Sequence, residues 1–503
     1  MSNFSMRVNV AASWMAYAMR LLIGFFLMPF VIHVLGDSQY GFWIFINSIA
    51  GYAGLMYLGF GATVSRYVAK YQSTSDWKNL NETVSLVTCV YCGMACVALF
   101  VTGILIAIAP WLNDWQGHSI LEIRLVILLL GLNVAAGLVG SVFGGILIGS
   151  RRFDLERLVY FLSDVARLIF LVTLLRQEWG LVIIAAIYLG MTVAENLSYA
   201  FFSFRIIPQL SIRLRHLNWE SVQRCFSFSS FAFLNALASQ LIYATDTIVI
   251  GTFLGATSIV PYYIALRLCQ FIKQPVEHIS EICMPTAGAL QAQSREDSMR
   301  TLMVRAIGVS ILLTTGMFIG CLFFSPLLLN LWMGPGYGQT YPLLLVLFSA
   351  QIVALPIGVL RAFLFGTGNV RLPAVIYLLE AFANLALSIV LCLWLGNLGV
   401  ALGTAIPILL FELFILLPYG LKTLKIPSKL LVKDGILPQL IPLTSLALYS
   451  AAVHHYLLPQ LPTTWPTLIG ITIGGGLALA IGLLAQVYAK TGSLNLKAAL
   501  GSR

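Results

Sequence analysis

Long apolar runs, separated by short polar breaks, extend over most of the chain. A run of about 20 apolar residues can cross the hydrocarbon core of a bilayer as a helix, because a helix satisfies its backbone groups within its own segment. The runs predict fourteen membrane-spanning helices. Their approximate limits are 8–34, 41–64, 84–109, 121–148, 157–175, 179–204, 227–253, 259–289, 303–331, 341–360, 372–394, 399–418, 436–457 and 466–489.

The 29 Lys and Arg residues divide unevenly between the segments that connect these spans. With the N-terminus in the cytoplasm, 23 of them fall in cytoplasmic segments and only Arg124 and Arg176 fall in outer ones. Cytoplasmic loops of membrane proteins carry an excess of Lys and Arg. We therefore expect a multi-pass membrane protein with both termini in the cytoplasm.

Composition agrees with a membrane protein, since 59% of the residues are hydrophobic and 10% are charged, against about 25% charged in soluble domains. The net charge of +10 fits a cytoplasmic face that meets anionic lipid headgroups, so no nucleic acid partner is expected. The outer loops are too short for a catalytic domain, and the phosphate-loop pattern GxxxxGK[ST] is absent. The pattern favours a protein that is not an enzyme and needs no cofactor.

A Leu-Gly pair closes both the first and the seventh span, at Gly36 and again 219 residues later at Gly255. Six spans separate these turns, so both face the same side, and an even offset predicts parallel repeats around a central cleft. The alternative is two unrelated hairpins that share Leu-Gly.

The predicted fold is an all-α polytopic membrane protein of about 14 transmembrane helices. Its parts are an N-lobe at 1–204, a cytoplasmic linker at 205–226, a C-lobe at 227–418, and two further spans with a tail at 419–503.

Charged side chains inside spans are costly and require a partner or a function. Arg20 lies near the middle of the first span with no acidic residue within four positions. We expect it either to face a watered cleft, where a guanidinium can bind an anionic headgroup, or to pair with Glu380 or another acid on a different helix.

Several other charges have candidate partners. Helical spacing predicts pairs between Asp164 and Arg167 and between Lys273 and Glu277, with Glu281 four residues further on. Asp246 and Arg267 lie at similar depth in adjacent spans and could pair. For each pair, a structural role and a role in transport remain open. The candidates for coupling or charge pairing are Asp246, Lys273, Glu277, Glu281 and Glu380.

Amide, hydroxyl and aromatic side chains gather in the seventh and eighth spans, where they could line a cleft for sugars. The candidate substrate-binding residues are Arg20, Arg267, Asn235, Gln240, Tyr243 and Gln270. No metal site is expected, because the helically spaced Cys89, Cys92 and Cys96 have no His or acid nearby and are typical of packing.

Two stretches carry a resemblance to a known family. "RLLIGFFLMPFVIHVLGDSQYGFWIFINSIAGYAGLMYLGFGATVSRYVAKY" (20–71) resembles the N-terminal signature of Wzx-type polysaccharide and O-antigen flippases. "DTIVIGTFLGATSIVPYYIALRL" (246–268) resembles the start of that family's second lobe. The family belongs to the multidrug/oligosaccharidyl-lipid/polysaccharide (MOP) superfamily, and the resemblance covers most of the chain in span order.

The resemblance implies a flippase of the bacterial cytoplasmic membrane that moves undecaprenyl-pyrophosphate-linked oligosaccharides from the inner to the outer leaflet by alternating access. A glycan polymerase and a chain-length regulator are its implied protein partners. Arg20 and Arg267 occupy spans where such flippases carry cavity cations, although the spans here hold four cations and seven acids. The alternative is a MATE-like proton- or sodium-coupled antiporter of drugs or cations. Arg20 disfavours it, because a cation in the cleft repels cationic cargo.

Overall fold

The computed structural model describes residues 3–57, 60–112, 119–213, 237–242 and 244–491. Side chains are described from Ile23 onward, except at 53, 56–57, 60–63, 111–112 and 490–491. All regular structure in these ranges is helical. The chain divides into two compact units, unit 1 from Met1 to Val260 and unit 2 from Pro261 to Arg503, which are described separately. The lobe and linker boundaries expected from the sequence remain a prediction.

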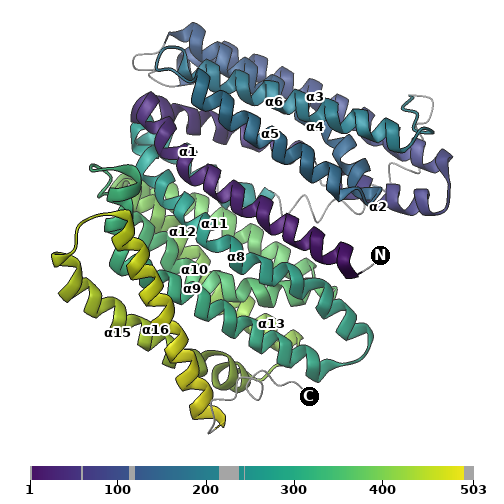
Figure 1. The fold of residues 1–503 in the computed structure, drawn as a ribbon. Helices are drawn as coiled ribbons and strands as arrows, with labels where there is room; N and C mark the ends of the chain where they lie inside the picture. Colours follow the sequence, from purple (N-terminus) through teal and green to yellow (C-terminus); the bar gives the residue numbers. More distant parts are fainter. Residues whose placement is uncertain (1–2, 58–59, 113–118, 214–236, 243, 492–503) are drawn as a thin grey trace. The chain divides into compact units, whose positions relative to one another are not determined.

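Unit 1 is a bundle in which α3, α4, α5 and α6 run side by side (Figure 1). Its core contains large, fully buried side chains such as Tyr91, Leu138 and Ile146. The elements of unit 1 are α1 (Asn3–Gly51), the 3-10 helix η1 (Tyr52–Tyr57), α2 (Phe60–Ser73), α3 (Trp77–Leu112), α4 (Ile120–Gly149), α5 (Phe153–Leu174), α6 (Gly180–Ile206), helical segments at 237–242 and 244–253, and the 3-10 helix η3 (Ala256–Ser258).

Unit 2 is built around α8 to α12, and its C-terminal helices α15 and α16 pair with each other and pack on α9. Figure 1 shows this pair in yellow-green and yellow. The elements are α8 (Ile259–Ala292, which begins at the end of unit 1), α9 (Glu296–Met333), α10 (Thr340–Gly366), α11 (Arg371–Leu395), α12 (Asn397–Phe411), η4 (Glu412–Leu416), α13 (Leu417–Thr423), α14 (Ser428–Leu430), η5 (Leu431–Ile436), η6 (Leu437–Gln439), α15 (Leu440–Ala452), η7 (Val453–Leu457), η8 (Leu458–Gln460) and α16 (Trp465–Thr491). Of these, η4, η5 and η7 are π-helical.

Nine helices within the described residues are long and apolar enough to cross a membrane. Helices α5 and α8, which coincide with the fifth and eighth predicted spans, carry several charged residues and are not among these nine. The expected count of fourteen spans therefore remains a prediction, whereas the all-helical membrane fold is confirmed.

The predicted second span, 41–64, is wrong as a continuous helix. Helix α1 ends at Gly51, η1 follows, and α2 starts at Phe60. Two glycines, Gly51 and Gly54, lie at the break, and each lowers helix propensity by about 1 kcal/mol relative to alanine. A 3-10 stretch inside a helical span often marks a hinge.

Backbone dihedral angles repeat at the same interval of 219 residues that separates the two Leu-Gly pairs in the sequence. Gly36 and Gly255 have nearly the same dihedral angles, with φ of 77° and 87° and ψ of 165° for both. Ser75 and Ser294, also 219 residues apart, share a φ of 54°. The residue after each serine donates its backbone N–H to a carbonyl five residues earlier, at 2.9 Å and 3.0 Å. This repetition supports an internal repeat over two unrelated hairpins.

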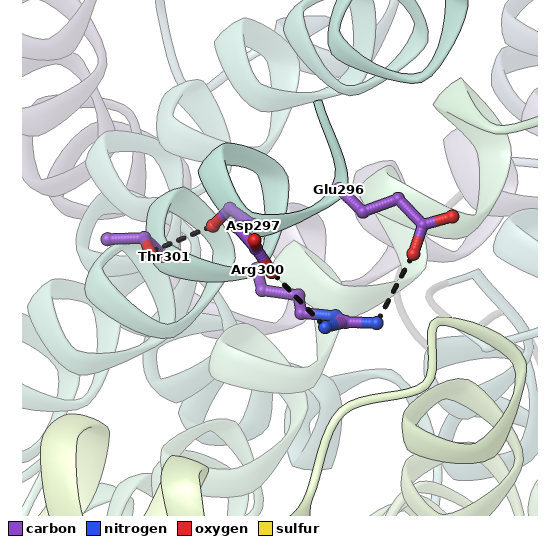
Figure 2. A network of polar contacts seen from close by, with 4 residues as sticks. All are labelled: Glu296, Asp297, Arg300 and Thr301. Atoms are coloured by element: carbon purple, nitrogen blue, oxygen red, sulfur yellow. Dashed lines mark hydrogen bonds and ion pairs between the residues drawn. The ribbon is translucent and has the colours of Figure 1, made fainter. Parts of the chain in front are cut away.

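Polar side chains stabilise the helices that follow these two serine turns. Figure 2 shows Arg300 of α9 beside Glu296 and Asp297, each 3.3 Å from the guanidinium. Acids in a first turn also interact favourably with the helix dipole. Before α3, Asp76 accepts the backbone N–H of Asn79 at 3.1 Å, and hydrogen bonds from Asn79 lower the pKa of the Asp76 carboxyl below its usual value. Asp76 thus caps the start of α3 with its side chain, whereas α9 is stabilised by the charges of its first turn.

We expect Gly36→Ala and Gly255→Ala each to destabilise the protein by about 1–3 kcal/mol, because essentially only glycine adopts this backbone region. The matched control is Gly93→Ala in α3, where an added methyl group meets no atom within 4 Å. Thermal unfolding in detergent, followed by intrinsic fluorescence, compares the three midpoints. Equal midpoints for all three variants would contradict a special role for the two turns.

Candidate functional site

A row of polar side chains, the α8 stripe, follows one face of α8. Its members are spaced by four, three, four, three and four residues, which keeps them on one side of a helix. The first and last members lie 18 positions apart, or roughly 27 Å along the helix, close to the ~30 Å thickness of the hydrocarbon core. The stripe consists of Tyr263, Arg267, Gln270, Gln274, Glu277 and Glu281.

The stripe is accessible, whereas the opposite face of α8 is not. Every member of the stripe is partly or largely exposed. Across the helix, Ala265, Val276 and Ala287 are fully buried, and Cys269 nearly so. Because polar side chains inside a membrane normally face a watered cavity or the protein interior, the exposed stripe is the part of unit 2 best suited to contact a polar cargo.

Arg267 is oriented by its neighbours in the stripe. Its Nε donates to the hydroxyl of Tyr263 at 2.8 Å, and Nη1 donates to Oε1 of Gln270 at 3.1 Å. The guanidinium also lies over the ring of Tyr263, 4.9 Å from its centre. These three contacts hold the planar, permanently charged group in one direction. The arrangement suits the binding of an anion by paired hydrogen bonds.

The far half of the stripe is acidic and partly paired. Lys273 Nζ lies 3.1 Å from Glu277 Oε1, and His278 Nδ1 lies 2.9 Å from Glu281 Oε2. Glu281 is the more exposed of the two acids. The stripe thus changes from cationic near Arg267 to acidic near Glu281, and a charged cargo on it would meet both signs.

Lys273 also belongs to a set of charges inside unit 2, here called the buried charge cluster: Lys273, Arg361, Glu380 and Glu412. Arg361 of α10 forms an ion pair with Glu412 of η4. Glu380 of α11 interacts electrostatically with both Arg361 and Lys273. Each of the two acids is only 2% exposed. Four helical elements are therefore joined by opposite charges.

The cluster retains unused hydrogen-bonding capacity. One carboxylate oxygen of Glu380 and one of Glu412 are buried without a hydrogen-bond partner, as are both polar atoms of the Asn384 side chain. Arg361 lies 4.8 Å from the ring centre of Tyr377, which gives its cation a partner besides Glu412. Unsatisfied buried polar atoms are unusual and are consistent with a place where protonation or geometry changes.

The candidates in unit 1 lie around the helical segment 244–253. Asp246 is 1% exposed and interacts electrostatically with Tyr52. Its neighbour Thr245 is hydrogen-bonded to the Tyr52 hydroxyl. On the other side of Asp246, Thr247 donates to Ser48 at 2.7 Å. Hydroxyl contacts thus attach this segment to α1 and η1. The expected pairing of Asp246 with Arg267 remains a prediction.

Three other sequence candidates have less structural detail. Gln240 is half-buried and borders the end of α1 at Gly51. Arg20 lies within α1, but its side chain is outside the described residues, as are Asn235 and Tyr243. Their assignment to a cleft stays a prediction. Among the residues that the structure does describe, no group of three His, Cys, Asp or Glu side chains could hold a metal ion.

Arg361 and Glu412 were the functional candidates that the sequence missed. Arg361 falls one position beyond the predicted tenth span, 341–360, but it lies inside α10, which continues to Gly366. Glu412 lies within the predicted twelfth span, 399–418, with no Lys or Arg three or four residues away. Since 51 residues separate them, no helical spacing could have joined them.

Comparisons with known proteins agree with this architecture. A family model described as polysaccharide biosynthesis protein matches residues 76–342. The chain is 19% identical over 414 residues to the uncharacterized membrane protein EpsK of Bacillus subtilis, which covers 80% of each protein. It is 22% identical over 417 residues to the putative O-antigen transporter of Shigella flexneri, covering 79% of this chain and 94% of that protein.

Solved structures define the fold. The lipid II flippase MurJ, in an inward closed conformation, matches with a TM-score of 0.73 and 16% identity, covering 96% of this chain and all of that one. At this identity the likeness concerns the fold alone. The predicted family resemblance is confirmed by the matched family model, which spans more than half of the chain. The chain is a multi-pass membrane protein that belongs to the polysaccharide biosynthesis protein family.

Proposed function

We propose that the protein is a flippase for undecaprenyl-pyrophosphate-linked oligosaccharides. It moves the glycan unit from the inner to the outer leaflet of a bacterial cytoplasmic membrane by alternating access, with both termini in the cytoplasm, and it makes or breaks no bond. Family membership supports transport in polysaccharide biosynthesis. Relatives named as transporters and flippases support a lipid-linked glycan as the cargo.

The observation that carries the proposal is the α8 stripe. A pyrophosphate headgroup that crosses bare hydrocarbon loses hydration worth tens of kcal/mol by idealised solvation estimates. A polar surface of roughly 27 Å offers hydrogen bonds at nearly every depth of the bilayer. The lipid tail can stay among acyl chains throughout, so only the headgroup needs this surface.

We assign roles to the candidates accordingly. Arg267, oriented by Tyr263 and Gln270, binds the pyrophosphate together with Arg20. The amides and hydroxyl of Gln270, Gln240, Asn235 and Tyr243 bind sugar hydroxyls. A glycan polymerase and a chain-length regulator receive the product in the outer leaflet.

The buried charge cluster supplies coupling in this proposal. Headgroup binding near Arg267 changes the field at Lys273, six residues further along α8. Lys273 interacts with Glu277 and Glu380, and Glu380 interacts with Arg361. Anion binding on the stripe can therefore alter the pairing of buried acids. Glu281 and Asp246 are further candidates for this role.

The acidic half of the stripe favours one alternative, a MATE-like antiporter that exchanges protons or sodium ions for a cationic compound. Glu277 and Glu281 are accessible carboxylates that could attract such cargo. In that case cells that lack the protein gain sensitivity to cationic drugs and keep normal surface polysaccharide. The flippase proposal predicts the reverse.

A direct test uses the purified protein in liposomes that contain an undecaprenyl-pyrophosphate oligosaccharide with a fluorescent sugar. Chemical quenching from outside reports the fraction of headgroups in the outer leaflet. We expect quenching beyond the initial outer-leaflet fraction only in vesicles that contain the protein. If headgroups remain inaccessible while a cationic dye is exchanged for protons, the antiporter is the correct function.

A further inference from the structure

Unit 1 contains a cavity that the proposed transport does not use. Its volume is about 290 Å³, and it lies between the end of α1, η1, α3 and α4. Its walls include Phe45 and Ile49 of α1, Ala98 of α3, and Ile127 and Val134 of α4. These wall residues of α4 lie roughly 10–20 Å from the start of that helix, so the cavity is within the apolar part of the bundle.

The cavity offers almost nothing to a polar ligand. Only Tyr52 and Thr102 contribute polar side chains to its wall. The Thr102 hydroxyl donates to the backbone carbonyl of Ala98 at 2.7 Å, and the Tyr52 hydroxyl is hydrogen-bonded to Thr245. A buried water needs two to four polar partners, whereas apolar cavities stay dry and accept apolar molecules. The chemistry of the wall therefore selects hydrocarbon.

One wall of the cavity continues onto the surface that α3 exposes. Val101 lines the cavity and is 41% exposed. It belongs to an exposed apolar row on α3 with Val97, Phe100 and Ile104, of which Phe100 is 70% exposed. An apolar row at the middle of a membrane-spanning helix faces lipid. A chain from the bilayer can therefore reach the cavity beside Val101 without crossing a polar layer.

We propose that this cavity binds one acyl chain of a bilayer phospholipid. Its volume is about twice that of the ~150 Å³ apolar cavity that accepts benzene, which corresponds to a chain segment of about ten carbons. Straight acyl chains are the most abundant hydrocarbon at this depth. A polyisoprenoid tail carries methyl branches along a much longer chain and fits the same space less well.

The bound chain would support the break in the second span. Ile49, Ala50 and Tyr52 line the cavity at the point where α1 ends and η1 begins. A chain in contact with these residues fills the space beside the break between α1 and η1. Phospholipid is then a structural ligand of unit 1, and its loss lowers the stability of this lobe irrespective of which cargo is carried.

The test uses a phosphatidylethanolamine with a photoreactive diazirine in one acyl chain, mixed into liposomes that contain the full-length protein. After illumination, peptide mapping locates the cross-links. We expect cross-links at 98–105 of α3 and 127–134 of α4. In Ala98→Phe, whose ring occupies the cavity, these cross-links fall about tenfold, since a filled site leaves no room for further carbons.

The matched control is Ala107→Phe, which makes the same change at an exposed position of the same helix and should leave the cross-links unchanged. If Ala98→Phe does not fold, Val134→Phe fills the cavity from the opposite wall.

Undiminished cross-linking in a folded cavity variant overturns the proposal. So does competition by undecaprenyl phosphate but not by phospholipid, which would assign the cavity to a polyisoprenoid. Cross-linking does not depend on transport, so this result and the flippase test can fail independently.

Discussion

Arg361→Met is expected to destabilise the protein by about 3–5 kcal/mol, the usual cost of removing one partner of a buried ion pair. Glu412, only 2% exposed, would lose its ion-pair partner. Glu380, equally buried, would lose one of its two nearby cations. Because the unpaired carboxylates remain in an apolar interior, the variant should unfold at a much lower temperature in detergent, measured by intrinsic fluorescence.

Two further variants distinguish charge imbalance from loss of packing. In Arg361→Met combined with Glu412→Gln, both members of the pair are neutral, so much of the lost stability should return, since neutral replacement of a whole buried pair is often tolerated. Arg371→Met, at an exposed position at the start of α11, should leave the unfolding midpoint unchanged. A wild-type midpoint for Arg361→Met alone would show that the cluster contributes little to folding.

Local patterns in the sequence predicted much of the fold. The apolar run 303–331 corresponds to α9, although the helix extends from Glu296 to Met333, because hydropathy detects only the part of a helix that lies in lipid. Asp164 and Arg167 form the predicted pair at 2.7 Å, since a spacing of three residues on a helix fixes proximity. The positions of Arg267 and Gln270 on one face follow from the same rule.

Other features depend on packing between distant segments and could not be read from spacing. The Arg361–Glu412 pair joins two helices, and its partners are set by how α10 packs on η4. The contacts of Tyr52 and Ser48 with the segment 244–253 bridge nearly 200 residues. The glycines at 51 and 54 are compatible with the break after α1, but hydropathy alone predicts an uninterrupted span there. The sequence therefore predicts the polar face of α8 but not the ion pair between Arg361 and Glu412.

Arg267→Ala is expected to slow transfer of the lipid-linked oligosaccharide about 10- to 100-fold in the liposome assay. A hydrogen bond to a charged group contributes about 1.5–3 kcal/mol, and each 1.4 kcal/mol corresponds to a factor of ten. The proposed pyrophosphate would lose the fork of donors that Tyr263 and Gln270 orient. Arg267→Lys should retain part of the rate, because a lysine keeps the charge but not the paired geometry.

Tyr263→Phe provides an intermediate step, because it keeps Arg267 and the aromatic ring but removes the hydroxyl that accepts from Nε. We expect a smaller loss of rate than in Arg267→Ala, with the main effect on the substrate concentration that gives half-maximal transfer. Arg205→Ala, at an exposed position in the last turn of α6, controls for the loss of one positive charge. If Arg205→Ala slows transfer as much as Arg267→Ala, overall charge attracts the headgroup. A loss confined to Arg267 and its oriented neighbours places the headgroup on the α8 stripe.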